Sequence, residues 1–309
     1  MQVVILERNK LVGRKVARVF GTVFGARISV VDDVAAITGV LDQARVLCGD
    51  VFDADVIAEH VRARPSLRGV LYTAEPLKRS LKYLAESPRI DDVLARRDFE
   101  SPPAAWDLML AAYRIANPGA VYSIEAFGGF GQAIQQFEIS STAHRDSVTA
   151  QLAKFVEPFA VPSRLVDMIG EVGHEMMMNA MYDAPVDAHG RAKYAHDRKA
   201  SIELPANERP TLTVGCDGTR LALQVTDPFG RLERKHVVEG LARGLAGGEQ
   251  DRAHGGAGLG MLVCHNASAA LYFDVVRGRS TTATAVFELD TNLRELRTQA
   301  KSLHFWSST

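Results

Sequence analysis

The sequence predicts a mixed α/β protein in which a doubly wound parallel sheet is followed by a helical connector and a two-layer α/β part. Three observations lead to this fold class. Residues 1–115 alternate short apolar runs with amphipathic segments, residues 118–160 have a largely helical pattern, and residues 201–289 combine apolar runs with a hairpin turn. The chain has 309 residues, 47% hydrophobic and 24% charged, which is enough for two globular domains.

The first predicted domain, residues 1–117, shows strand and helix patterns in strict alternation. This order predicts a parallel sheet with helices on both faces and a reactive site at the carboxyl ends of its strands. Strands are expected at 3–6, 27–31, 45–48, 69–72 and 90–95, and helices at 10–20, 35–41, 56–63, 77–84 and 103–115.

Residues 118–160 form the predicted connector. Glycines at 128, 129 and 131 interrupt the periodicity, and Ser141 and Thr142 are typical of a helix start. Four apolar residues of this helix share one face: Val148, Leu152, Phe155 and Val156. That face is a candidate homodimer interface, and packing against the C-terminal domain of the same chain is an equally good alternative.

The last predicted domain, residues 161–309, begins with a long helix over 165–181. Asp217 and Gly218 are typical of a hairpin turn, so the sheet should be mostly antiparallel. Strands are expected at 201–204, 211–216, 221–226, 270–276 and 282–289, and further helices at 235–245, from 258 onward, and at 292–303.

Charge and cysteine usage narrow the function classes. The 36 basic and 37 acidic residues give a formal net charge of -1, so no basic excess indicates nucleic-acid or membrane binding. The N-terminus has no basic leader before its short apolar run and resembles a first strand. The three cysteines are far apart and form neither a metal-binding pair nor a disulfide framework, so we expect a cytoplasmic protein.

Glu175 and Asn179 are four residues apart on the predicted long helix and therefore project from one face. The amide oxygen of Asn179 could hold Mg²⁺ while a triphosphate supplies further ligands. Glu175 could then orient or deprotonate an attacking hydroxyl or water. Taken alone, such a pair is more often a solvated pair.

Asp227 follows an apolar run, where its carboxylate could accept a hydrogen bond from the amino group of adenine. Gly230 would allow the backbone to approach the base closely. The alternative is a plain turn, because Asp-Pro-x-Gly is a common turn sequence.

A glycine-rich segment precedes a helical pattern and is the strongest single motif. Backbone N–H groups and the helix dipole at such a position can face phosphate oxygens. Arg252 and His254 would add positive charge. A flexible loop explains the glycines but not the helical pattern that resumes at Leu259. The glycines are Gly255, Gly256, Gly258 and Gly260.

In this order the three motifs resemble, over about 164–290, the ATP-binding domain of the GHKL superfamily, which joins DNA gyrase, the heat-shock chaperone ATPases, histidine kinases and mismatch-repair MutL. The N box carried by Glu175 and Asn179 is closest in form to that of the anti-sigma-factor serine kinases. The resemblance implies a histidine kinase-like sandwich that binds ATP and Mg²⁺, with 231–257 as a mobile lid. It implies Glu175 as the general base, Asn179 as the metal ligand and Asp227 on adenine. The other implied nucleotide contacts are Asp183, Gly230, Arg252, Gly256, Gly258, Leu259, Gly260 and Thr282.

The sequence departs from this family in two places. In this family the motif that begins at Asp227 usually has glycines two and four residues later. Phe229 and Arg231 stand at these places, so Gly230 is one place out of register. Residues 185–200 resemble an insertion with three cations, Arg191, Lys193 and Arg198. We expect this insertion to be a solvated loop, with contact to phosphate or to a partner as the alternative.

Residues 1–116 resemble a response-regulator receiver domain. Glu7 and Arg8 follow the first strand, where the family has two acids. Asp50 falls at about the phosphoacceptor position, with Asp53 as its rival. The receiver family also has a Thr or Ser and a Lys in this pocket. Thr73 falls at the place of the hydroxyl residue, and Arg96 or Arg97 at the place of the lysine. Because one acid is replaced by a base and the lysine by arginine, we expect a pseudo-receiver that contacts proteins, with an Arg8–Asp50 salt bridge filling the pocket.

These motifs predict an intracellular signalling protein that binds Mg-ATP and transfers phosphate to a serine or threonine of a regulatory partner protein, under control of the receiver-like domain. One alternative is a non-catalytic regulator that works through protein contacts, including an aromatic tail at 303–306. A further alternative is a histidine kinase, for which His144 is the candidate phosphoacceptor.

Overall fold

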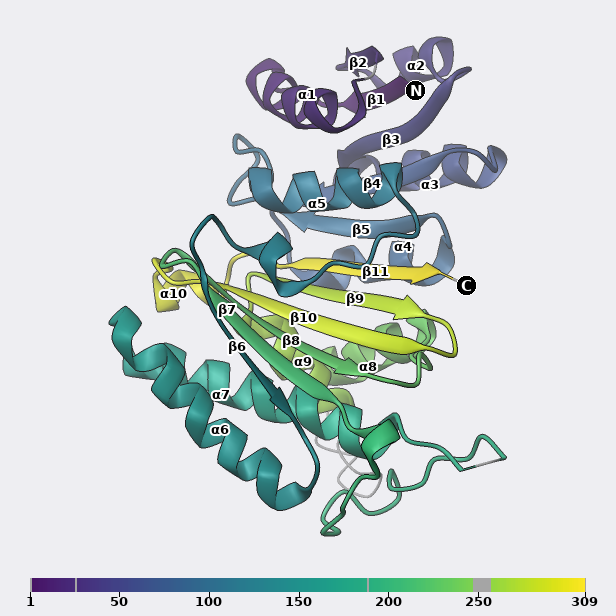
Figure 1. Cartoon of the computed structure of the whole chain (residues 1–309). Helices are drawn as coiled ribbons and strands as arrows, with labels where there is room; N and C mark the ends of the chain where they lie inside the picture. The colour runs from purple at the N-terminus through teal and green to yellow at the C-terminus, as the bar shows by residue number, and fades with distance from the viewer. Residues whose placement is uncertain (1, 26, 188, 247–256, 309) are drawn as a thin grey trace. The chain divides into compact units, whose positions relative to one another are not determined.

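The structure is a computed structural model that describes residues 2–25, 27–187, 189–246 and 257–308. The chain divides into two compact units, shown in Figure 1. Unit 1 comprises Met1–Ala120 and Thr298–His304, and unit 2 comprises Val121–Arg297 and Phe305–Thr309. Both units combine a sheet with helices, so the predicted α/β class is confirmed. Within the described ranges, no helix has the length and apolar character needed to cross a bilayer.

Unit 1 contains a parallel sheet in the order β2-β1-β3-β4-β5, which is a doubly wound order. Val3, Val46 and Val70 on its central strands are fully buried, as a parallel sheet covered on both faces requires. The strands are β1 (Gln2–Leu6), β2 (Arg27–Val31), β3 (Ala44–Asp50), β4 (Arg68–Thr73) and β5 (Ile90–Ala95).

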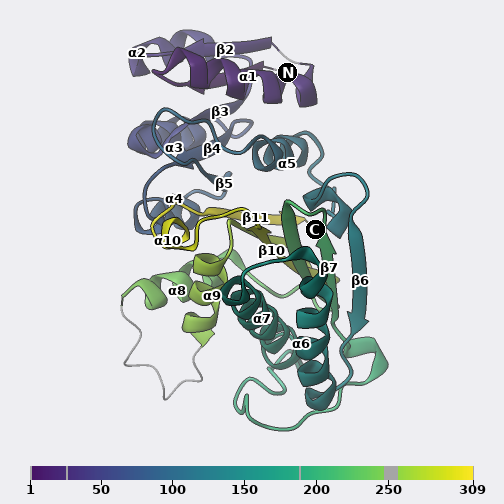
Figure 2. The ribbon, with the colours of Figure 1, turned by 90° about the vertical axis from the view of Figure 1, so that its left-hand side faces the viewer.

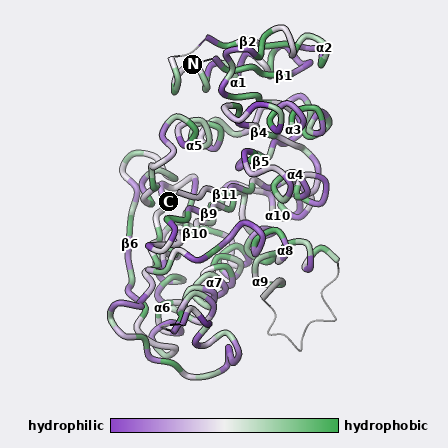
Figure 3. The backbone as a smooth tube through the Cα atoms, turned by 90° about the vertical axis from the view of Figure 1, so that its right-hand side faces the viewer, coloured by the Kyte–Doolittle hydropathy of each residue, from purple (hydrophilic) through white to green (hydrophobic). Residues whose placement is uncertain are grey.

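Helix α1 of unit 1 has capping residues at both ends and an apolar face along one side. The side chain of Asn9 accepts backbone N–H groups at the start of α1, and Gly25, with φ 55°, ends the helix. Val12, Val16 and Phe20 on its inner face belong to the core, and the tube in Figure 3 alternates hydrophobic and hydrophilic residues along this helix. The helices are α1 (Lys10–Phe24), α2 (Val34–Ile37), α3 (Ala54–Ala63), α4 (Leu81–Glu86) and α5 (Ala105–Ala116).

The helix predicted over 292–303 is wrong. Only α10 (Leu293–Leu296) is helical there, and it is followed by a strand, β11 (Ser302–Ser308). The first part of β11 belongs to unit 1 and pairs antiparallel with β5. His304 is fully buried, with Nδ1 2.8 Å from Asp92 and Nε2 3.0 Å from Asp107. These ion pairs favour a strand at this place although the local charge pattern favours a helix.

Unit 2 contains an antiparallel sheet in the order β9-β10-β8-β7-β6, and helices α6 to α9 cover one of its faces (Figure 2). The strands are β6 (Ala133–Glu138), β7 (Thr211–Cys216), β8 (Arg220–Asp227), β9 (Ala270–Val276) and β10 (Ser280–Glu288). The helices are α6 (Thr142–Val156), α7 (Ser163–Met178), α8 (Arg234–Leu245) and α9 (Ala257–Ala267).

Three further features of unit 2 differ from expectation. Strand β6 lies in the predicted connector, and the strand expected at 201–204 is reduced to a single bridge between Ser141 and Glu203. The aromatic tail is not an exposed surface, because Phe305 and Trp306 are 4% and 3% exposed. Trp306 packs on Tyr122 and Tyr272, with ring centroids 5.3 and 5.4 Å away.

We expect His304 to make the stability of unit 1 depend on pH. Asp107 and Asp92 raise the pKa of the buried imidazole to about 9, above its ordinary value of 6.5. The ion pairs therefore stabilise the fold fully below pH 6.5, and this contribution, about 3 kcal/mol, is lost as the pH rises through 9. Urea unfolding at pH 6 and pH 9.5 measures this difference in the free energy of unfolding. Hydrogen exchange of β5 identifies which transition belongs to unit 1.

The variant His304→Gln should lose this pH dependence and be less stable at pH 6 by about 3–5 kcal/mol, because two buried carboxylates lose their cation. The exposed His196, changed to Gln, is the matched control and should behave as wild type. An unchanged pH dependence in His304→Gln would contradict the assignment.

Candidate functional site

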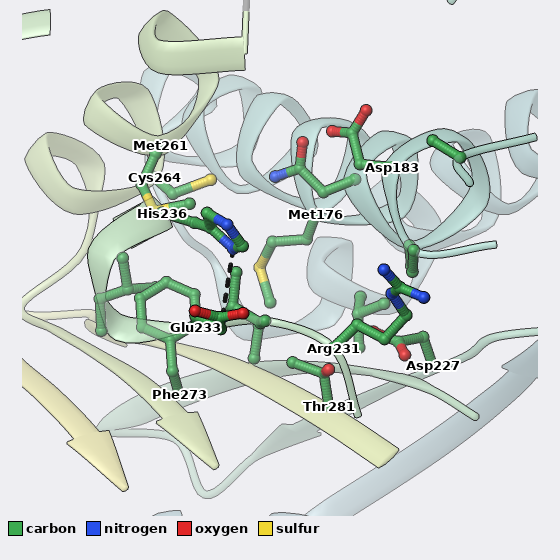
Figure 4. A pocket seen from close by; sticks show the side chains of 18 of the residues that line it. Met176, Asp183, Asp227, Arg231, Glu233, His236, Met261, Cys264, Phe273 and Thr281 are labelled. Atoms are coloured by element: carbon green, nitrogen blue, oxygen red, sulfur yellow. Dashed lines mark hydrogen bonds between the residues drawn. The ribbon is translucent and has the colours of Figure 1, made fainter. Parts of the chain in front are cut away.

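Unit 2 contains a cavity of about 370 Å³ between its sheet and its helices (Figure 4). This volume lies within the range of small-molecule sites. The apolar lining includes Met176, Val225, Met261, Leu271 and Phe273. The polar lining includes Asn179, Asp183, Asp227, Arg231, His236 and Thr281. The cavity therefore brings together three predicted site residues, namely Asn179, Asp183 and Asp227.

Asn179 and Asp183 reach the cavity from a π-helical turn. Helix α7 ends at Met178 and continues as the π-helix Asn179–Asp183, in which the Ala184 N–H donates to the Asn179 carbonyl at 3.1 Å. A π turn is wider than an α turn and is often found at functional sites. Residues four apart in it lie almost one above the other, so both side chains line the same wall.

Asp227 ends strand β8 and is 7% exposed. Its Oδ1 accepts the backbone N–H of Phe229 at 2.9 Å. Burial raises the pKa of this carboxyl to about 6, although hydrogen bonds from backbone N–H groups and from Thr281 oppose the shift. Thr281 lines the cavity with Asp227, whereas Thr282 bonds to the Thr226 hydroxyl at 3.0 Å and is not part of the lining.

Gly230 supports this corner of the cavity through the backbone. Its φ is 61°, and a Cβ there would fall 2.7 Å from the Arg279 nitrogen and 2.8 Å from the Gly278 nitrogen. Its carbonyl accepts the Gly278 N–H at 3.2 Å. The glycine that looks out of register in the sequence thus lets the turn after Asp227 pack against the β9–β10 hairpin.

The remaining predicted residues lie outside the lining. Glu175 faces α9, where a Cβ on Gly260 would lie 2.9 Å from its carboxyl carbon and overlap its oxygen. Leu259 is 47% exposed, and Gly258 lies in α9. Arg252, Gly256 and the rest of 247–256 within the predicted lid over 231–257 lie outside the described residues, while α8 occupies 234–245 of that lid.

Several cavity residues were not predicted. Helix α8 contributes His236, Glu239 and Arg243, whose spacing is that of one helix face. His236 accepts the Glu233 N–H at 3.2 Å and so helps to cap this helix. No signal in the sequence indicates them, because these three side chains are exposed, whereas the buried residues of α8 are Val237, Gly240 and Leu241.

The expectation of a solvated loop over 185–200 is wrong for Arg198. Its side chain is only 12% exposed. One guanidinium nitrogen donates to Asn179 Oδ1 at 2.9 Å and lies 3.6 Å from Asp183 Oδ2. By contrast, Arg191 of the same segment is 76% exposed and pairs with Asp187. One cation of the insertion thus contacts the wall of the cavity.

In unit 1 the predicted receiver-like residues converge at the carboxyl ends of the strands. Arg96, which is 5% exposed, lies 2.6 Å from Asp50 and 3.3 Å from Glu7. Its backbone N–H donates to the Thr73 carbonyl at 2.8 Å. Burial raises the pKa of Asp50, and Arg96 only partly opposes this. The guanidinium therefore occupies the position next to the candidate phosphoacceptor.

The expected Arg8–Asp50 salt bridge is wrong. Arg8 pairs instead with Asp53 at 2.5 Å and keeps 57% of its side chain exposed. His144, the candidate of the histidine kinase alternative, lies in the first turn of α6 in unit 2, with Nδ1 3.2 Å from the Ser140 hydroxyl.

No protein-family model matches this chain, and no curated protein matches it either. Solved structures do match parts of it. A protein described as pilus assembly-related from Burkholderia pseudomallei matches with a TM-score of 0.32 and 18% identity, over 38% of this chain and 89% of that one. A pilus assembly protein from Burkholderia thailandensis matches with a TM-score of 0.32 and 20% identity, over 38% and 98%. The SiaB-SiaC complex from Pseudomonas aeruginosa matches with a TM-score of 0.35 and 17% identity, over 50% and 88%. Likenesses this low carry no argument about function.

We expect Gly230→Ala to destabilise unit 2 by at least about 2 kcal/mol, because the new Cβ adds backbone overlap to the cost of a positive φ. Gly278→Ala is the matched control. Its φ is 69°, but no atom lies within 4 Å of the new Cβ, so only the conformational cost of about 1 kcal/mol remains. Urea unfolding compares the two variants, and equal losses would contradict the packing role of Gly230.

We expect Arg96→Ala to destabilise unit 1 by about 3–5 kcal/mol, because it leaves Glu7 and Asp50 buried without their cation. Arg97→Ala is the control, because Arg97 and its partner Asp98 are 75% and 46% exposed, and it should cost about 1 kcal/mol or less. Urea unfolding at pH 7 measures both changes. If Arg96→Ala cost no more than Arg97→Ala, the buried ion pairs of Arg96 would not stabilise unit 1.

Proposed function

We propose that unit 2 binds an adenine nucleotide in its cavity. The observation that carries this proposal is the buried carboxylate of Asp227, which lines the same cavity as Asn179 and Asp183. A buried carboxylate accepts hydrogen bonds strongly, and each of its oxygens can accept more than one. It therefore suits the amino group of adenine.

The walls of the cavity support the same ligand class. Met176, Leu271 and Phe273 provide apolar surfaces that a flat base can pack against. Arg231, His236 and Arg243 add positive or proton-binding groups to the lining. An apolar pocket with few convergent polar groups is the usual form of a cofactor site.

Phosphoryl transfer to a serine or threonine of a partner protein stays a prediction. It would need Glu175 to act on a hydroxyl, and this carboxylate packs against Gly260 outside the cavity lining. Mg²⁺ at Asn179 also stays a prediction, since Arg198 donates to the oxygen that would hold it.

We infer for unit 1 a role in protein contacts. The Arg96 guanidinium beside Asp50 supports this inference, because it takes the place that a phosphoryl group and its cation would need. Two exposed rings, Phe52 and Phe99, lie 5.3 Å apart, and Arg96 also lies over Phe99. Exposed aromatic side chains are common at protein interfaces.

Asp227→Asn should weaken ATP binding about tenfold at pH 8, the effect of losing one charge-assisted hydrogen bond. The carboxyl has a pKa of about 6, so wild-type affinity should be full above pH 7 and fall as the pH is lowered through 6. Isothermal titration calorimetry at pH 8, 7 and 5.5 measures both effects.

The Asn variant should not show this fall in affinity, and GTP, which lacks the amino group at this position, should bind more weakly than ATP. Asp290→Asn, on the exposed turn after β10, is the matched control and should bind as wild type. No binding of ATP at millimolar concentration would overturn the proposal.

A further inference from the structure

Arg198 places a positive charge against the wall of the cavity formed by the π turn. Its guanidinium donates to Asn179 Oδ1 at 2.9 Å and lies 3.6 Å from Asp183 Oδ2. Both partners line the cavity, so the cation is adjacent to the space that a ligand would occupy. The Arg198 side chain is 12% exposed and lies behind the lining residues, which do not include it.

The segment that carries Arg198 is tied to the same wall. The Tyr182 hydroxyl, from the π turn, donates to the Ala200 carbonyl at 2.5 Å, two residues after Arg198. Earlier in the segment, the Lys193 N–H donates to the Pro185 carbonyl at 3.0 Å, and its ammonium pairs with Glu208. These contacts hold the backbone on both sides of Arg198.

This arrangement does not fit a divalent metal at Asn179. Mg²⁺ needs oxygen ligands in a near-octahedral array. Here the amide oxygen accepts from a guanidinium, and the nearest carboxylate, Asp183, faces the same cation. A metal at this oxygen would lie next to a positive charge in a partly buried place. Among the described residues, no group of three or more His, Cys, Asp or Glu side chains is placed to hold a metal ion.

We propose that Arg198 is the cation that binds the phosphate groups of the nucleotide, so that unit 2 binds its ligand without a divalent metal. This inference rests on the proposed adenine site. A phosphate is a stronger acceptor than an amide oxygen, and a guanidinium can bind two phosphate oxygens at once. Arg198 would exchange Asn179 Oδ1 for phosphate oxygens beside it, and Asp183 would remain its second partner.

Calorimetry on the full chain tests the proposal, with ATP, ADP and adenosine titrated in EDTA and in Mg²⁺. Wild type should bind ATP in EDTA within about threefold of its affinity in Mg²⁺, and more tightly than adenosine. Arg198→Ala should weaken ATP about tenfold in EDTA, the effect of one charge-assisted hydrogen bond, and leave adenosine unchanged. Arg191→Ala, exposed on the same segment, is the matched control and should match wild type.

The possible outcomes separate the two proposals. The role of Arg198 is overturned if ATP binds only in Mg²⁺ and Arg198→Ala binds it at least as tightly as wild type. The adenine site would stand in that case. No binding of ATP or adenosine in either buffer overturns the adenine site itself. If Arg198→Ala does not fold, Arg198→Gln replaces it as a neutral variant that keeps a hydrogen-bond donor, and ATP affinity equal to wild type in EDTA would overturn the proposal.

Discussion

A carboxylate buried inside a folded unit has to find a partner inside the molecule, because its desolvation is otherwise too costly. Both units of this protein are built around that constraint. In unit 1, Asp50 faces Arg96, and Asp92 shares His304 with Asp107. In unit 2, Asp227 receives the N–H of Phe229. Three of these carboxylates use a side-chain cation, whereas Asp227 depends on N–H and hydroxyl donors and keeps a raised pKa of about 6.

This difference distinguishes a structural carboxylate from one available to a ligand. Arg96 fills the pocket of unit 1 from within, so that site has its cation already. Asp227 lies in a cavity of about 370 Å³ and can take a further donor. Arg198 pairs with two residues of the cavity wall, Asn179 and Asp183, and we propose that it also binds the phosphates of the ligand. In the proposed complex, Asp227 accepts a hydrogen bond from the ligand, and Arg198 neutralises its phosphate charge.

Local patterns in the sequence were sufficient to predict the α/β class, the parallel strands of unit 1 and the helices α7 to α9. They also predicted Asn179, Asp183 and Asp227 as site residues from motifs a few residues long, and these three line one cavity, while their roles stay predictions. They could not identify the partners of buried charges. Arg96 and Asp50 were both predicted for the receiver-like site, but Asp50 was expected to pair with Arg8. Arg198 contacts the cavity wall from a segment with no periodic pattern. Strand β11 was missed for the same reason, because His304 depends on Asp92 and Asp107.

The most direct test of the central claim is a crystal structure of the chain with a non-hydrolysable ATP analogue, grown in EDTA. The adenine amino group is expected on the Asp227 carboxylate and the phosphate oxygens on the Arg198 guanidinium, which then no longer contacts Asn179. A nucleotide bound elsewhere, or phosphates held apart from Arg198 while it stays on Asn179, would contradict the claim.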